Sequence, residues 1–150
     1  NLPGVADSSV DFVFSFDSLV HADIDVLEGY VQEIARVLKP GGAGFIHHSN
    51  LAALDQVAIK NKHLRDPTVS AEKVNALLED SGLRCQVYEL MPWDSDHAAK
   101  GQCIDALLTL RKGGGPSAPR YVENTKSLEI EKDVARVLHS IYGASGSEGG

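Results

Sequence analysis

Residues 10–16 read Val-Asp-Phe-Val-Phe-Ser-Phe and form an almost continuous apolar and aromatic run. Such a run is typical of a strand that is buried on both faces, as in a parallel sheet covered by helices. From Asp25 the apolar residues follow three-and-four spacing, which predicts a helix, and Asp25 with Glu28 resembles a capping box. Residues 39–42, Lys-Pro-Gly-Gly, end that helix, and residues 43–48 predict a second buried strand, in which Gly44 indicates a close neighbour.

The residues after this strand–helix–strand unit predict the rest of a sheet. Residues 51–59 are compatible with a short helix, and the polar residues 60–68 predict a loop. Ser70 is expected to cap a helix over residues 71–80, and Gly82 to end it in the left-handed conformation. Residues 84–90 and 103–111 predict two strands joined without a helix. The fold class is therefore α/β, a parallel sheet with an antiparallel last pair and helices on its faces.

The chain divides into four parts. Residues 1–112 are predicted to form the folded domain, and residues 113–127, which begin Gly-Gly-Gly-Pro, to form a linker. Residues 128–142 predict an amphipathic C-terminal helix, and residues 143–150 a disordered tail.

Composition limits the classes of function. With 150 residues, 43% of them hydrophobic, the chain is long enough for one domain or part of a larger one. Its net charge of -7 argues against a nucleic acid or an anionic membrane as the main partner. No run approaches the roughly 18 apolar residues of a membrane span, and no signal segment opens the chain, so a cytoplasmic protein is expected. The two cysteines are too few for a disulfide framework.

Polar residues follow both strands of the first unit, and ligands of open α/β sheets bind outside the carboxyl ends of parallel strands. The first strand leads into Ser15, Phe16, Asp17, Ser18 and His21, and the second into His47, His48, Ser49 and Asn50. Each of these residues also has an ordinary interpretation as a turn, cap or packing residue. Consecutive strand residues point to opposite faces, so at most one of His47 and His48 is expected to face the cleft.

Two other features of the sequence bear on the site. Asp17, His21 and one of His47 or His48 could be imagined as metal ligands, but no HxxxH or CxxC spacing is present, and no metal site is predicted. Trp93 and the following residues 94–97 form either a lid or substrate wall, or an ordinary surface loop with one packed aromatic ring.

Residues 1–50 resemble the second half of class I S-adenosylmethionine-dependent methyltransferases. The resemblance lies in Leu2-Pro3, in Ser9 to Ser15, and in residues 33–42, Glu-Ile-Ala-Arg-Val-Leu-Lys-Pro-Gly-Gly. It implies that the predicted strands are the fourth to seventh of the family's Rossmann-like sheet, through residue 112. The family's glycine-rich cofactor loop and the acidic residue after its second strand have no counterpart here. Because these features are missing and the chain starts at Asn1 inside a loop, a C-terminal fragment that is inactive alone is expected.

The resemblance also implies roles for the polar residues. Ser15, Phe16 and Asp17 would lie beside the cofactor S-adenosylmethionine, and His21 would border the transferred methyl group. His47, His48, Ser49 and Asn50 would face a small-molecule acceptor. Trp93 is expected as a further substrate wall from its position in the loop, and not from the resemblance. Because imidazole accepts protons near neutral pH, His21 or His47 is the expected catalytic base.

Two alternatives to a methyltransferase remain open from the sequence. One is a non-catalytic interaction module derived from the same fold, which self-associates through the exposed first strand. The other is an unrelated doubly wound enzyme, but the sequence contains neither G-x-S-x-G nor G-x-G-x-x-G.

Overall fold

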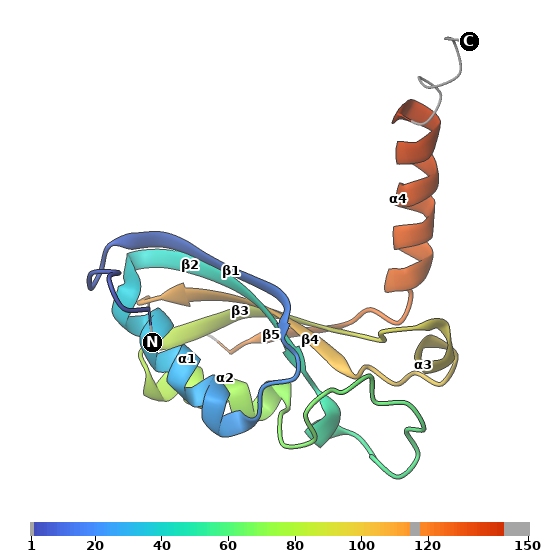
Figure 1. The fold of residues 1–150 in the computed structure, drawn as a ribbon, viewed down its shortest axis with the longest axis horizontal. Coiled ribbons are helices and arrows are strands. Elements are labelled where there is room, and N and C mark those ends of the chain that lie inside the picture. Colours follow the sequence, from blue (N-terminus) through green and yellow to red (C-terminus); the bar gives the residue numbers. More distant parts are fainter. Residues whose placement is uncertain (1, 115–117, 143–150) are drawn as a thin grey trace.

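The computed structural model describes residues 2–114 and 118–142, and they form a five-stranded mixed sheet with helices (Figure 1). The strand order is β1-β2-β4-β3-β5, so the predicted α/β class is confirmed. The predicted tail, residues 143–150, lies outside the described residues. The strands are β1 (Val10–Leu19), β2 (Leu38–Ser49), β3 (Leu83–Met91), β4 (Asp105–Lys112) and β5 (Arg120–Glu123), and the helices are α1 (Ile24–Val37), α2 (Ala71–Asp80), α3 (Ser95–Ala99) and α4 (Ser127–Tyr142), with a 3-10 turn η1 (Leu51–Ala53).

The β1–α1–β2 unit has the predicted topology, with β1 and β2 parallel and adjacent. Its helix begins earlier than expected. Asp23 is the N-cap, and its carboxylate accepts a hydrogen bond from the Val26 N–H, so the capping box predicted at Asp25 is wrong. Gly44 has the close neighbour that was predicted, since a Cβ there would lie 3.1 Å from a methyl group of Leu110.

Helices α1 and α2 cover one face of the sheet (Figure 1). The apolar stripe of α1 and the buried side of α2 pack against alternate residues of β2, β3 and β4, including Ile46, Tyr88 and Leu108. Ser70 caps α2 by accepting from the Lys73 N–H, and Gly82 follows it with a φ of 72°, both as predicted. This helix-covered face contains the main apolar core.

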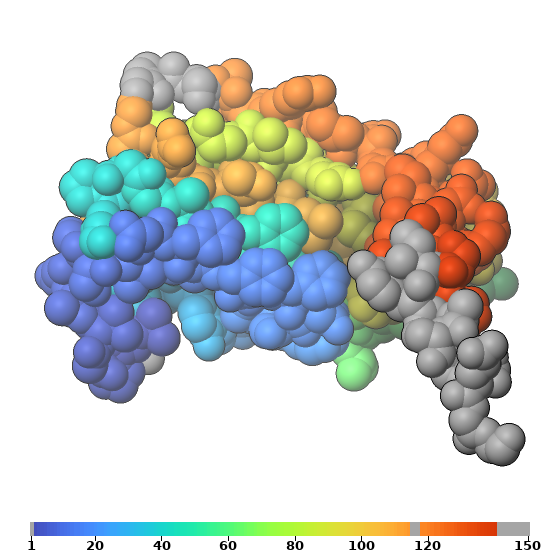
Figure 2. Space-filling model, turned by 90° about the horizontal axis from the view of Figure 1, so that it is seen from above, coloured from blue at the N-terminus to red at the C-terminus, as the bar shows by residue number. Residues whose placement is uncertain are grey.

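The opposite face of the sheet, here called the open face, carries Phe12, Phe14 and Phe16 from β1. These side chains are 55%, 66% and 47% exposed, although Phe14 stacks on Phe45 of β2. Figure 2 looks onto this face, where side chains of β1, β2, β4 and β3 reach the surface. The expectation that residues 10–16 are buried on both faces is therefore wrong for the part of the chain described. Within residues 2–114 and 118–142, both helices that pack on the sheet lie on its other side, and β1 is an edge strand.

Three segments differ from the sequence-based expectations. The short helix is limited to η1, because the Asp55 carboxylate accepts from the Val57 N–H and starts a turn there. The connection between β3 and β4, which was expected to lack a helix, contains α3, and the expected linker at 113–127 contains β5, which pairs with β3 in parallel. Helix α4 stands away from the sheet (Figure 1), with Ile130, Val134, Val137 and Leu138 each about half exposed. None of the helices within residues 2–114 and 118–142 is long and apolar enough to cross a membrane.

Candidate functional site

A buried polar cluster lies where β2 ends and β4 begins, on the side of the open face. It contains Asp17 from the end of β1, His47 from β2, Arg65 from the loop before α2, Trp93 after β3 and Asp105 at the start of β4. His47 and Asp105 are fully buried, and Arg65 is 5% exposed. Strands β1, β2 and β3 all run toward this end of the sheet, so the cluster occupies the place where such sheets bind ligands.

An ion pair between Arg65 and Asp105 is at the centre of the cluster. The guanidinium donates from Nε to Oδ1 at 2.9 Å and from Nη2 to Oδ2 at 3.1 Å, which is a bidentate geometry. Burial raises the pKa of the Asp105 carboxyl, but the side chains of His47 and Arg65 outweigh it and hold the pKa below its usual value. Asp105 is therefore a carboxylate at neutral pH.

His47 connects this ion pair to the end of β1. The backbone N–H of Asp17 donates to His47 Nδ1 at 3.2 Å, which leaves the imidazole proton on Nε2, 3.5 Å from Asp105 Oδ2. Asp17 itself has a φ of 55°, and its Oδ1 lies 3.6 Å from Arg65 Nη2. Asparagine and aspartate tolerate this left-handed conformation better than most residues. The contacts of His47 thus hold the left-handed backbone at Asp17, which lies within an irregular part of β1 near its end.

Aromatic rings cover the cluster. The Arg65 guanidinium carbon lies 4.1 Å from the centre of the Trp93 ring, a cation–π contact, and Trp93 also packs on a small apolar group around Leu51 and Ile104. Phe16 lies over His47, with ring centres 4.9 Å apart. The structure therefore brings together four of the predicted site residues: Phe16, Asp17, His47 and Trp93.

His21 lies apart from this cluster, in the loop between β1 and α1. Its side chain is exposed, and Nδ1 donates to the backbone carbonyl of Leu64 at 2.8 Å. A carbonyl oxygen only accepts, so this contact places the proton of the neutral ring on Nδ1. Nε2 then carries the free lone pair, which is the property that a proton acceptor needs.

Four other predicted residues make internal contacts. His48 is buried on the helix-covered face, where its Nδ1 donates to the Ser49 carbonyl and its ring meets Tyr88 edge-on. Burial lowers the pKa of His48 to about 4. Ser49 donates to the Asp66 carbonyl, and half-buried Ser15 pairs with Ile46 on the same face as His48.

Asn50, which is 2% exposed, uses both ends of its amide. Its nitrogen donates to the Cys103 carbonyl at 3.0 Å, and its oxygen accepts from the Ala71 N–H at 3.0 Å. The structure thus places Asn50 between the start of β4 and the start of α2. The roles assigned to Ser15, His48, Ser49 and Asn50 stay predictions.

Arg65 and Asp105 were absent from the sequence-based site. A signal was available for Asp105, because it is the one charged residue in the otherwise uncharged segment 103–110. A buried carboxylate requires a cationic partner, so that strand predicts one. Arg65 lies in a polar loop with several other charged residues, and nothing in that pattern distinguishes it.

A second group of polar side chains adjoins the cluster and consists of His63, Asp94 and His97. Burial raises the pKa of the Asp94 carboxyl, but the N–H of His97 and the imidazole of His63 outweigh it and lower the pKa to about 2. A cavity of about 470 Å³ lies elsewhere, between the end of α2 and the start of β3. It is therefore at the opposite end of the strands from both polar groups.

Comparison with known proteins agrees with this architecture. Residues 1–46 match a family model described as "Methyltransferase domain". An S-adenosylmethionine-dependent methyltransferase from Methanosarcina mazei superimposes with a TM-score of 0.52 at 19% identity, over 73% of this chain and 62% of the other. The chain has a class I S-adenosylmethionine-dependent methyltransferase-like fold.

Other structures share this methyltransferase-like fold at similarly low identity. A putative S-adenosylmethionine-dependent methyltransferase from Listeria monocytogenes has a TM-score of 0.52 at 10% identity, over 73% of this chain and 64% of its own. The [4+2]-cyclase SpnF has a TM-score of 0.54 at 18% identity, over 77% of this chain and 53% of its own. The chain thus spans less than two thirds of each of these structures. No curated protein matches it in sequence.

Proposed function

We propose that this chain is the acceptor-side part of an S-adenosylmethionine-dependent methyltransferase that acts on a small molecule. The observation that carries the proposal is the methyltransferase family match over residues 1–46, which contain β1, α1 and most of β2. The polar residues gathered where these strands end support it further. Fold alone does not identify a reaction, as the cyclase SpnF with the same fold illustrates.

The end of β1 fits one side of a bound cofactor. Phe16 is 47% exposed, and the left-handed backbone at Asp17 is held by contacts with His47 and Arg65. Among the described residues, however, no strand leads through a glycine-rich loop into a helix. The second side of such a site is thus not provided within residues 2–114 and 118–142, and we expect methyl transfer only from a longer parent protein.

His21 is the residue best suited to accept a proton from the acceptor. Bound S-adenosylmethionine would supply a methyl group on a positively charged sulfur, which makes proximity and orientation most of the catalytic effect. With the cofactor bound, an acceptor O–H or N–H would give its proton to His21 Nε2 while the acceptor's lone pair bonds to the methyl carbon. The carbon–sulfur bond would break at the same time and leave its electron pair on sulfur, so that the neutral thioether is the leaving group. The contact from Nδ1 to Leu64 keeps the ring in the required tautomer.

His47 has a different role in this proposal. It is fully buried, and its two nitrogens face Asp17 and Asp105. We therefore assign it as a positioning residue for the left-handed backbone at Asp17, and the Arg65–Asp105 ion pair lies beside its other nitrogen. Trp93, which is half-buried and lies against Arg65, forms the wall of the acceptor site.

The test uses the longer protein that contains this chain, incubated with methyl-labelled S-adenosylmethionine and a panel of small hydroxyl and amine acceptors. We expect transfer by the wild type and about a 100-fold lower kcat for His21→Gln. His139→Gln, which changes an exposed histidine on α4, should be unaffected. Equal kcat values for His21→Gln and the wild type would exclude His21 as the base, and the absence of any transfer would overturn the proposed function.

Calorimetry on residues 1–150 alone tests whether this chain binds the cofactor without the rest of the proposed site. Without the second side of the cofactor site, we expect no binding of S-adenosylmethionine in the micromolar range. A micromolar dissociation constant would show that this chain holds the cofactor by itself.

A second candidate function is self-association through β1. The strand is at the sheet edge in the part of the chain described, and its three phenylalanines are about half exposed. Unpaired edge strands with apolar side chains are templates for pairing with another chain. Sedimentation that shows a concentration-dependent dimer would support this role, and a monomer at all concentrations would exclude it.

A further inference from the structure

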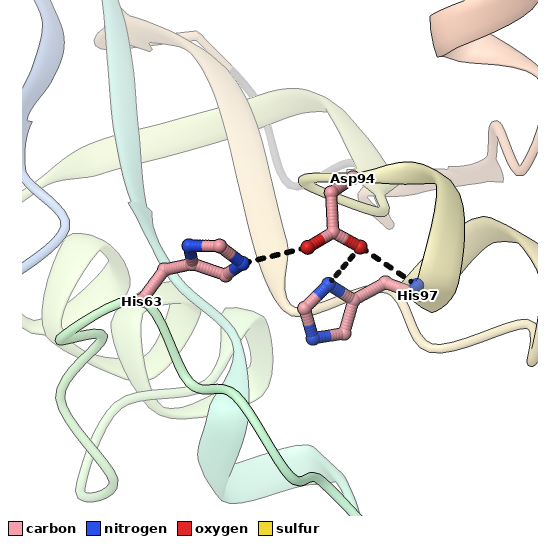
Figure 3. Close-up of side chains that lie close together, drawn as sticks. All are labelled: His63, Asp94 and His97. Carbon is pink, nitrogen blue, oxygen red and sulfur yellow. Dashed lines mark hydrogen bonds and ion pairs between the residues drawn. The ribbon is translucent and has the colours of Figure 1, made fainter.

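Two histidines and an aspartate converge beside the buried polar cluster (Figure 3). His63 comes from the loop between η1 and α2, whereas Asp94 and His97 come from the start of α3. His63 Nε2 lies 2.7 Å from Asp94 Oδ2, and His97 Nδ1 lies 2.8 Å from Asp94 Oδ1. One ligand atom from each residue lies within 4.8 Å of the other two.

The hydrogen bonds of His97 leave one ring nitrogen without a partner. Its side chain is 2% exposed, and Nε2 donates to the backbone carbonyl of Asn61 at 2.8 Å. Because a carbonyl oxygen only accepts, the proton of the neutral ring is on Nε2, and Nδ1 presents a lone pair. That lone pair faces the Asp94 carboxylate, and Nδ1 makes no hydrogen bond in the structure. Two acceptors therefore face each other, one on the buried His97 ring and one on the Asp94 carboxylate, which is 34% exposed, and a cation between them would stabilise this arrangement.

We propose that His63, Asp94 and His97 form a binding site for a divalent transition metal ion, of which Zn²⁺ is the best match. The ligand atoms are His63 Nε2, one Asp94 oxygen and His97 Nδ1, and water completes a tetrahedral set. Zinc bonds to these atom types are about 2.0–2.2 Å long, so bound ligand atoms lie about 3.3 Å apart. The short pairs, at 2.7 Å and 2.8 Å, involve different oxygens of Asp94, so only one of them joins two ligand atoms. That pair would open by about half an ångström, and the longer separations, which are within 4.8 Å, would close toward the same spacing through side-chain rotation.

Two of the three proposed ligands, His97 and Asp94, are held in place by hydrogen bonds to other groups, as the ligands of metal sites commonly are. The His97–Asn61 hydrogen bond fixes the tautomer that exposes Nδ1, as ligating histidines commonly require. Asp94 is also held, since it caps α3 by accepting from the His97 N–H at 2.9 Å. These ligands differ from Asp17, His21, His47 and His48, the set for which the sequence predicts no metal.

A metal ion here would join the two loops that complete the buried polar cluster. Arg65 is two residues from His63 and donates to its carbonyl at 3.1 Å, and Trp93 is next to Asp94. The ion would thus fix the positions of Arg65 and Trp93 relative to each other. We infer a structural role that is independent of whether the parent protein transfers methyl groups.

The test is zinc binding by the untagged, chelator-treated chain of 150 residues, measured in competition with a chromophoric chelator. We expect one Zn²⁺ per chain with a micromolar or lower dissociation constant, and a rise in the melting temperature on zinc addition. His63→Gln and His97→Gln should each weaken binding at least about 10-fold, and so should Asp94→Asn, which keeps the helix cap. Co²⁺ in place of zinc should give the visible absorption of a tetrahedral site.

Two matched variants serve as controls. His139→Gln removes an exposed histidine, and Asp96→Asn removes an exposed carboxylate from the same helix as His97. Both should bind zinc within about 2-fold of the wild type. If buried His97→Gln fails to fold, the partly exposed His63→Gln decides the question. Substoichiometric binding by the wild type, or unchanged binding by His63→Gln, would overturn the proposal and leave His97 and Asp94 as an ion pair.

Discussion

The two faces of the sheet differ in what they bury. The helix-covered face is apolar, and α1 and α2 remove it from water. The open face carries exposed phenylalanines along β1 and a buried, charged cluster at the carboxyl end of the strands. His47 and His48 show the difference between neighbours, since one contacts charged groups on the open face and the other packs against Tyr88 in the core.

The helix-covered face therefore supplies most of the stability, and the open face holds the charged groups of the candidate site. Apolar burial stabilises one face by roughly 25 cal/mol for each Å² removed from water, whatever the order of its residues. On the other face, Arg65 and Asp105 are expensive to bury, and their mutual contact mainly offsets that cost. Such charged pairs position neighbouring side chains and add little net stability. Substitutions on the two faces test this contrast.

Removing one partner of the buried ion pair should have the largest effect. Arg65→Met leaves the Asp105 carboxylate buried without its cation, and we expect the free energy of unfolding to fall by about 3–5 kcal/mol in urea titrations. Arg65→Met with Asp105→Leu should recover much of that loss. Arg136→Met, an exposed arginine on α4, is the control and should change stability by less than about 0.5 kcal/mol. A small loss for Arg65→Met would mean that water reaches the cluster.

Adjacent leucines of β4 give a direct comparison of the faces. Leu108 is fully buried on the helix-covered face, and Leu107 is half-buried on the open face. Leu108→Ala should lower the free energy of unfolding by about 3 kcal/mol because it leaves a cavity, and Leu107→Ala by about 1 kcal/mol. Equal losses in urea titrations would show that the open face is covered in solution.

The pH dependence of stability should reveal His48. Because burial lowers its pKa to about 4, the folded state keeps it neutral while the unfolded state takes up a proton below about pH 6.5. Stability from this group is therefore lost as the pH falls, by about 2 kcal/mol between pH 7 and pH 5.

The variant His48→Phe tests this assignment, since it removes the titrating group but keeps a ring against Tyr88. Urea titrations at pH 7 and pH 5 should show a smaller difference for His48→Phe than for the wild type. His139→Phe, with its exposed position, should retain the wild-type difference. An unchanged pH dependence in His48→Phe would assign the acid sensitivity to other groups.

The smallest effect on stability is expected at Phe14, which is 66% exposed. Phe14→Ser should change the free energy of unfolding by less than about 1 kcal/mol. If β1 mediates self-association, the same variant should weaken the dimer in sedimentation at least about 10-fold. A large loss of stability would instead indicate that this ring is buried by another part of the molecule.

The sequence predicted the elements whose signals are local. Three-and-four spacing, the Ser70 cap and the stop at residues 39–42 located α1 and α2 closely, because each signal depends on neighbours in the chain. Strand β2 was predicted to begin at residue 43, but it begins at Leu38 and includes the residues predicted as the stop. Segments that depend on distant partners were missed. Strand β5 is only four residues long and exists through its pairing with β3, and an apolar strand pattern does not tell which of its faces is covered.

The same distinction applies to the site. The carboxyl-end rule found Phe16, Asp17 and His47, because strand ends can be located from the sequence. It could not find Arg65, since a loop charge is identified only when folding brings it to Asp105. The exposed position of His21 and the buried position of His48 follow from packing, which residue type alone does not report.

The amide of Asn50 makes the geometry of three elements depend on one side chain. It satisfies a carbonyl at the entry to β4 and an N–H at the entry to α2, directly after β2 ends. Aspartate has the same shape but no hydrogen to donate, and leucine offers neither a donor nor an acceptor. The Asn50 amide therefore links the sheet to α2 through one hydrogen bond that it donates and one that it accepts. Replacement by the isosteric aspartate would remove the donated bond and keep the accepted one.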